Sequence, residues 1–161
     1  MAMPPLSLKG RALRLLSGRE FSRAELERKL ATHEQTPGEL AQVLDSLQAK
    51  GFICEQRVVD SVVHRRASRL GAARIRHELQ QKGLDAGLVH AAMAGLQASE
   101  LARAREVWRK KFGAGLPLDA LEPATGPAAR ARQVRFMAAR GFAAETIRRV
   151  IGSGDDEMAT D

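Results

Sequence analysis

The stretch FSRAELERKL at residues 21–30 contains a complete helix start and predicts an α-helical fold. The Ser22 hydroxyl can accept a hydrogen bond from the backbone N–H of Glu25, while the Glu25 carboxylate can accept one from the N–H of Ser22. Phe21, just before this pair, can pack against Leu26 inside the helix. These contacts satisfy N–H groups that a helix leaves free at its start, so we expect a helix that begins just after Ser22.

Helices are also expected on either side of this stretch. Residues 8–16 carry helical periodicity and predict the first helix of the group. Thr36 is a suitable N-cap and Pro37 a suitable first helical residue, and Gly51 can end the same helix in a left-handed conformation. We therefore predict that residues 7–53 form a first three-helix module.

Two further groups of helices are predicted, at residues 54–98 and 99–152. Four valines in the first of these follow a spacing of i, i+1, i+4 and i+5, which is typical of a helix and not of a strand. Asp85 can cap the helix that follows it. In the last group, Val134 and Met137 are predicted to face the core. Each group therefore predicts a three-helix module of its own.

A weak internal repeat links the second and third modules. At an offset of 58 residues, the turn KGL at residues 82–84 falls on RGF at residues 140–142, together with apolar positions around it. Modules of this size cannot bury a good core alone and must pack against their neighbours. The expected fold is therefore all-α, an elongated tandem array of three three-helix modules.

Two segments are expected to lie outside the helices. Residues 113–127 hold three prolines and three glycines and predict a loop within the third module. Residues 153–161 carry four acidic side chains and predict a disordered acidic tail.

Composition favours an intracellular protein. The chain has 161 residues, a formal charge of +7 and one cysteine, Cys54, which excludes an intramolecular disulfide and fits a reducing compartment. Cys54 lies beside apolar Ile53 with no histidine at catalytic spacing, which favours an inert side chain. Residues 1–8 do not resemble a secretory signal, and no stretch approaches the ~20 apolar residues of a membrane span. We expect a cytoplasmic monomer without membrane contact.

The sequence shows no motif for catalysis, cofactors or metals. His33, His64, His77 and His90 do not stand at i, i+4 or beside paired ligands, so a metal site is not expected. The glycines at residues 113–115 lack the Lys-Ser/Thr pair of a phosphate-binding loop. We therefore expect no enzymatic activity and no cofactor.

The charge distribution favours an acidic or polyanionic partner. The net charge is +2 in residues 1–53, +3 in 54–98, +6 in 99–152 and −4 in the tail. Aromatic platforms for stacking bases are scarce, and Trp108 lies in an apolar stripe that predicts a core position. DNA-backbone contact and protein-surface contact both remain open.

Two other classes of function remain open for this sequence. Helix, turn and helix over residues 22–53 are also how a winged-helix DNA-binding domain begins, which would make the chain a transcriptional regulator. Residues 54–60 contain no hairpin turn residues, and the missing wing counts against this class. A helical scaffold for another acidic protein is the third class.

The motifs, taken in order, resemble the RecX family of proteins that regulate the RecA recombinase. The resemblance rests on FSRAELERKL at 21–30, LGAARIRHELQQKG at 70–83, WRKKF at 108–112 and RGFAAETI at 140–147. The chain departs from many relatives by having no aromatic residue at 55–60, and by Ala143 where a serine cap is common.

This resemblance implies a modular crescent lying in the groove of a RecA–DNA filament. There it would limit filament growth or promote disassembly, and inhibit strand exchange, ATP hydrolysis and co-protease activity, linking the chain to DNA repair, recombination and the SOS response. We predict that its cations meet recombinase carboxylates or DNA phosphates. The contact candidates are Arg65, Arg66, Arg69, Arg74, Arg103, Arg109, Lys110, Lys111, Arg132, Arg135, Arg140, Arg148 and Arg149.

Overall fold

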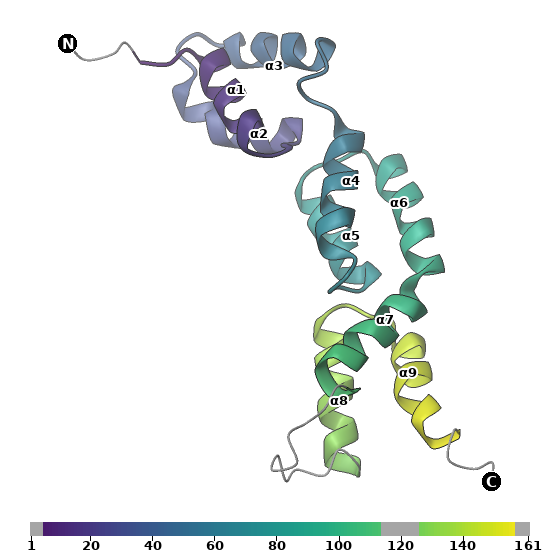
Figure 1. Ribbon diagram of the computed structural model, residues 1–161. Helices are drawn as coiled ribbons and strands as arrows, with labels where there is room; N and C mark the ends of the chain where they lie inside the picture. Colours follow the sequence, from purple (N-terminus) through teal and green to yellow (C-terminus); the bar gives the residue numbers. More distant parts are fainter. Residues whose placement is uncertain (1–4, 114–125, 157–161) are drawn as a thin grey trace. The chain divides into compact units, whose positions relative to one another are not determined.

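A computed structural model of the chain describes residues 5–113 and 126–156 (Figure 1). Within these ranges the regular elements are all helical, which confirms the all-α class. The helices are α1 (Leu8–Gly18), α2 (Arg23–Leu30), α3 (Glu39–Ala49), α4 (Glu55–Arg66), α5 (Ala72–Gln81), α6 (Ala86–Ala98), α7 (Glu100–Trp108), α8 (Pro127–Ala139) and α9 (Ala144–Asp156), with short 3₁₀ and π turns η1 (Ala31–His33) and η2 (Arg109–Gly113).

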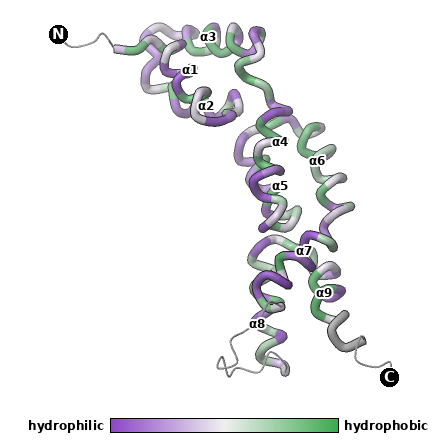
Figure 2. The backbone as a smooth tube through the Cα atoms, viewed as in Figure 1, coloured by the Kyte–Doolittle hydropathy of each residue, from purple (hydrophilic) through white to green (hydrophobic). Residues whose placement is uncertain are grey.

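The chain packs as two compact units. Unit 1 comprises residues up to Val62 together with Leu79–Val89, and unit 2 comprises Val63–Glu78 together with the residues from His90 onward. Hydrophobic and hydrophilic residues are interspersed along the helices (Figure 2), and no helix in the described ranges is long and apolar enough to cross a membrane.

The start of α2 confirms the predicted capping pair. Ser22 Oγ accepts a hydrogen bond from the Glu25 N–H at 3.2 Å, and the Ser22 N–H donates to Glu25 Oε2 at 2.9 Å. Phe21 and Leu26 are both buried in the core of unit 1, where α1, α2 and α3 meet. The local rule alone was sufficient here, because both partners lie within one turn.

The predicted start of α3 was wrong. The helix begins at Glu39 and not at Pro37, and its N-cap is Gly38, whose φ of 86° lies in the left-handed region. The Glu34 carboxylate accepts hydrogen bonds from the N–H groups of Gly38 and Leu40, both at 3.0 Å. A longer side chain upstream thus takes the capping role predicted for Thr36.

Within unit 1, the turn after α5 contacts the start of α2. Ser22 Oγ also donates to the Lys82 carbonyl, and Lys82 Nζ lies 2.8 Å from Glu25 Oε1. Burial alone would raise the pKa of Glu25, but hydrogen bonds from Lys82, the Ser22 N–H and Arg19 outweigh it and lower the pKa to about 2. The start of α2 is therefore joined to the turn after α5 by polar contacts.

The same kind of joint occurs in unit 2. The Gly71 N–H, just before α5, donates to the Arg140 carbonyl at 2.8 Å, and the Ala73 N–H donates to the Gly141 carbonyl at 3.3 Å. A Cβ on Gly71 would lie 2.2 Å from the Gly141 carbonyl oxygen, so only glycine permits this approach. The two turns that align at an offset of 58 residues, 82–84 and 140–142, thus occupy corresponding joints.

The core of unit 2 lies between α7, α8 and α9, with α9 packed against both other helices. Trp108 packs against this core as predicted, and its Nε1–H donates to Gln133 Oε1 at 3.1 Å. Met137 is fully buried as expected, but Val134 is 39% exposed, so its predicted inward position was wrong. Gln133 takes that position because Trp108 supplies the polar partner that its buried amide requires.

Two expectations concern segments outside the predicted helices, and a third concerns the array as a whole. Helix α9 continues to Asp156, so the tail is not disordered from residue 153, and residues 157–161 lie outside the described residues. Of the predicted loop, Gly113 belongs to η2 and Pro127 begins α8, while residues 114–125 also lie outside the described residues. The elongation of the array stays a prediction.

Candidate partner-binding surface

All thirteen contact candidates lie in unit 2. Eleven of them are exposed, whereas Arg103 and Arg140 are half-buried. The exposed ones come from three places: the end of α4 with the start of α5, the end of α7, and the outer faces of α8 and α9.

The first group consists of Arg65, Arg66, Arg69 and Arg74. Arg66 Nε forms an ion pair with Glu78 Oε2 at 2.9 Å, which partly neutralises it. Arg69 and Arg74 are exposed and form no ion pair with any residue that the structure describes. Cations without a local carboxylate lose no existing contact when they meet an anionic partner.

The second group is the basic tract of Arg109, Lys110 and Lys111, which begins where α7 changes into a π turn. Arg109 and Lys110 share one carboxylate, that of Glu106, at 2.9 and 3.8 Å. Lys111 Nζ lies 5.9 Å from the centroid of the Phe136 ring. These ion pairs are exposed and therefore weak, so a partner's carboxylate or phosphate could replace Glu106.

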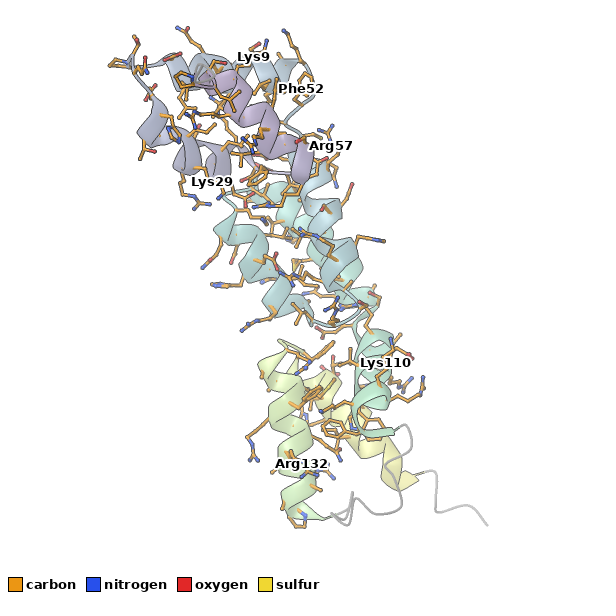
Figure 3. The ribbon with its side chains drawn as sticks, turned by 60° about the vertical axis from the view of Figure 1, so that its left-hand side comes forward. Lys9, Lys29, Phe52, Arg57, Lys110 and Arg132 are labelled. Carbon is orange, nitrogen blue, oxygen red and sulfur yellow. The ribbon has the colours of Figure 1, made fainter. Side chains whose placement is uncertain are left out.

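The third group consists of Arg132 and Arg135 on α8 and Arg148 and Arg149 on α9, all exposed. Figure 3 shows Lys110, after the end of α7, and Arg132, on α8, at separate places in the module. The candidates therefore come from several helices, and no single helix carries all of them.

Arg103 has a structural role that the sequence did not indicate. Its guanidinium donates to the carbonyls of Ala67 at 3.0 Å, Leu70 at 2.6 Å and Leu96 at 2.8 Å, which lie after α4 and in the last turn of α6. Burial lowers the pKa of Arg103, and the nearby Glu100 carboxylate partly opposes this shift. Arg103 satisfies carbonyls at two helix ends and has little left for a partner.

Arg140 is likewise turned toward its own module. Its guanidinium carbon lies 3.5 Å from the centroid of the Phe136 ring, a cation–π contact. The side chain is half-buried there. We therefore set Arg103 and Arg140 apart from the exposed candidates.

Sequence reasoning missed Glu100, whose side chain on α7 contacts the starts of two other helices of unit 2. Its side chain is 6% exposed, and its carboxylate accepts from the Ala72 N–H at 3.0 Å, the Ala143 N–H at 3.4 Å and Thr146 Oγ1 at 2.9 Å. One carboxylate thus caps the starts of both α5 and α9. The sequence signal that could have indicated its burial was its position four residues before Ala104, on the apolar stripe of α7.

The described residues contain no group of three or more His, Cys, Asp or Glu side chains that could hold a metal ion. The four histidines are all exposed and lie apart in the sequence. Cys54 is a free thiol of intermediate exposure. The exposed arginines and lysines offer a partner cationic contact.

Comparison with known proteins assigns the family. The models described as the first, second and third three-helix domains of RecX match residues 9–47, 55–93 and 98–151. The regulatory protein RecX of Leptothrix cholodnii is 53% identical over 154 residues, covering 96% of this chain and 93% of that protein. That of Ralstonia nicotianae is 47% identical over 157 residues, covering 96% and 94%.

Solved structures support the same fold. A crystal structure of regulatory protein RecX superposes with a TM-score of 0.69 at 18% identity, covering 91% of this chain and 71% of that one. RecX from Lactobacillus salivarius superposes with a TM-score of 0.69 at 17% identity, covering 92% and 94%. The chain therefore belongs to the RecX family of regulatory proteins.

Proposed function

We propose that this chain binds a RecA–DNA filament and lowers its recombinase, ATPase and co-protease activities without catalysing a reaction itself. The observation that carries the proposal is the match of all three RecX domains, in order, over residues 9–151. Its place of action would be the cytoplasm and its working form a monomer.

The basic tract at residues 109–111 is the contact that we propose first. Its Arg109 and Lys110 side chains are 64% and 67% exposed, and one glutamate serves both of them. A carboxylate of the recombinase or a DNA phosphate would gain charge-assisted hydrogen bonds there. The exposed cations of α8 and α9 would extend the contact along the module.

The deciding experiment is a titration of the chain onto preformed RecA filaments, with DNA-dependent ATP hydrolysis as the readout. We expect the wild-type chain to lower the rate at a sub-stoichiometric ratio. An unchanged rate at every ratio would contradict the proposed function.

Charge reversal tests the basic tract itself. Changing Arg109, Lys110 and Lys111 together to Glu should raise the concentration needed for half-inhibition by about tenfold or more. The matched control reverses Lys9, Lys50 and Arg76, three exposed cations outside the candidate set, and should stay within about twofold of wild type. Equal losses in both variants would exclude the tract as a specific contact.

DNA footprinting without RecA separates the transcriptional-regulator alternative. Helix α4 begins at Glu55, directly where a winged-helix domain would place its wing. We therefore expect no sequence-specific protection, and only weak binding that falls steeply with salt. A defined footprint at low nanomolar protein would favour the alternative.

A further inference from the structure

Unit 1 contains a basic pocket that none of the contact candidates lines. It has a volume of about 520 Å³ and opens between α1, α2 and η1. Its cationic lining residues are Arg11, Arg14, Arg19 and Lys29, and His33 adds an imidazole. Among the described residues no Asp or Glu lines it, although the first module as a whole has a net charge of only +2. Positive charge is thus concentrated on one face of a nearly balanced module.

The floor of the pocket is apolar. Leu6, Leu15, Phe21 and Leu30 line it, and Leu6 is 46% exposed at its edge. An exposed leucine beside a cavity of this size can bury an apolar side chain of a partner. The floor therefore supplies hydrophobic contact, and the rim supplies positive charge.

Two of the four cationic side chains, Arg14 and Lys29, are exposed and have no hydrogen-bond or ion-pair partner within the described ranges, and the same holds for His33. The other two are partly engaged, since Arg11 donates to the Leu6 carbonyl and Arg19 forms an ion pair with Glu25. The pocket thus presents unneutralised charge next to apolar surface. This combination fits a ligand that carries both carboxylates and an apolar group.

Nucleic acid fits the pocket less well. The aromatic ring in its floor, Phe21, is 5% exposed, and the Arg19 guanidinium carbon lies 3.6 Å from the ring centroid. The ring face on which a base would stack is therefore covered. A phosphate backbone would use the cations but would leave the apolar floor without a contact.

We propose that this pocket binds an acidic peptide segment of a partner protein, with an apolar side chain on the floor and flanking carboxylates on Arg14, Lys29 and His33. The proposal does not depend on the filament proposal, because the pocket lies in unit 1 and shares no residue with the candidates in unit 2.

Fluorescence anisotropy of a short labelled peptide, Glu-Glu-Phe-Glu-Glu, tests the proposal on the full chain. We expect saturable binding that weakens about tenfold or more in the double variant Arg14→Glu with Lys29→Glu, and less in the milder Arg14→Gln with Lys29→Gln. The matched control, Lys9→Glu with Lys50→Glu, should stay within about twofold of wild type. Figure 3 shows Lys9 and Lys29 on different sides of the first module.

Two further probes test the ligand chemistry. A peptide with Ser in place of Phe should bind about tenfold more weakly, because the floor loses its apolar contact. A labelled oligothymidylate should bind weakly and with no greater loss in the pocket variant than in the control variant. Peptide binding that ignores the pocket variants or the Phe-to-Ser change would overturn the proposal, as would oligothymidylate binding that depends specifically on Arg14 and Lys29.

Discussion

Replacing Glu100 by alanine should destabilise unit 2 severely, although the residue is an acid in an otherwise apolar stripe. Its carboxylate accepts three hydrogen bonds, and two of the donors are N–H groups at the starts of α5 and α9. Hydrogen bonds to a charged group contribute roughly 1.5–3 kcal/mol each, or roughly 5–9 kcal/mol for three. Removing a buried carboxylate recovers several kcal/mol of desolvation, so we expect a net loss of about 3 kcal/mol.

Urea unfolding measures this loss in unit 2 directly. Trp108 is the only tryptophan of the chain and packs against the core of unit 2, so its fluorescence reports that unit. With an m-value of about 2 kcal/mol/M, Glu100→Ala should lower the fluorescence midpoint by about 1.5 M. Glu100→Gln, which keeps one acceptor oxygen, should lower it by about half as much.

Glu106→Ala is the matched control, because Glu106 lies on the same helix with a side chain that is 50% exposed. Its exposed ion pairs contribute about 0.5 kcal/mol, so its midpoint should remain close to that of wild type. A shift below about 0.5 M for Glu100→Ala, or equal shifts for the two alanine variants, would refute the assignment of Glu100 as a double helix cap.

Three further perturbations test the joints and caps. Gly71→Ala places a Cβ 2.2 Å from a carbonyl oxygen and should destabilise unit 2 by about 2–3 kcal/mol in the same assay, whereas Gly95→Ala, in α6 of the same unit, meets no atom within 4 Å and should be neutral or stabilising. The lowered pKa of Glu25, about 2 in the folded chain against 4.5 for the free group, stabilises the chain fully above pH 4.5, and this stability is lost as the pH falls toward 2. Between pH 5 and pH 3 the free energy of unfolding, followed by circular dichroism, should therefore fall more for wild type than for Glu25→Gln, by on the order of 1–2 kcal/mol. Parallel pH profiles for the two proteins would contradict this. Glu34→Ala should cost about 1 kcal/mol by removing the cap of α3, and Thr36→Ala should cost less; the reverse order would restore the cap predicted from the sequence.

The sequence predicted those features whose partners lie within one helical turn. The reciprocal bonds of Ser22 and Glu25 are one case. Asp85 is another, because its Oδ1 accepts from the N–H groups of Gly87 and Leu88 as expected. Such contacts follow from spacing alone, since the helix itself brings the two groups together.

The features that sequence reasoning missed depend on residues far apart in the chain. The sequence analysis did not single out Glu100, and it predicted Arg103 to be a surface cation. In the structure both side chains cap helix ends that other segments contribute. The sequence predicted Val134 in the core, and the burial of Gln133 could not be inferred from periodicity, because the partner of its amide, Trp108, lies 25 residues away. Periodicity shows which face is apolar, but not which polar group will find a partner there.

The thirteen contact candidates stay a prediction. Eleven of them are exposed, and charge counting overlooked the pocket in unit 1. A module with a net charge of +2 can still gather its cations on one face, and only the packing of α1 against α2 reveals that.

The joint at Gly71 and Gly141 has a consequence for how the surface can vary. Its hydrogen bonds join main-chain groups, and its close approach requires that a side chain be absent at both Gly71 and Gly141, where a Cβ would lie 2.2 Å and 2.6 Å from main-chain atoms. The meeting of successive modules in unit 2 is therefore insensitive to which charges the exposed faces carry. A chain built in this way can change the partner chemistry of its surface by single substitutions while the register between its repeats is preserved.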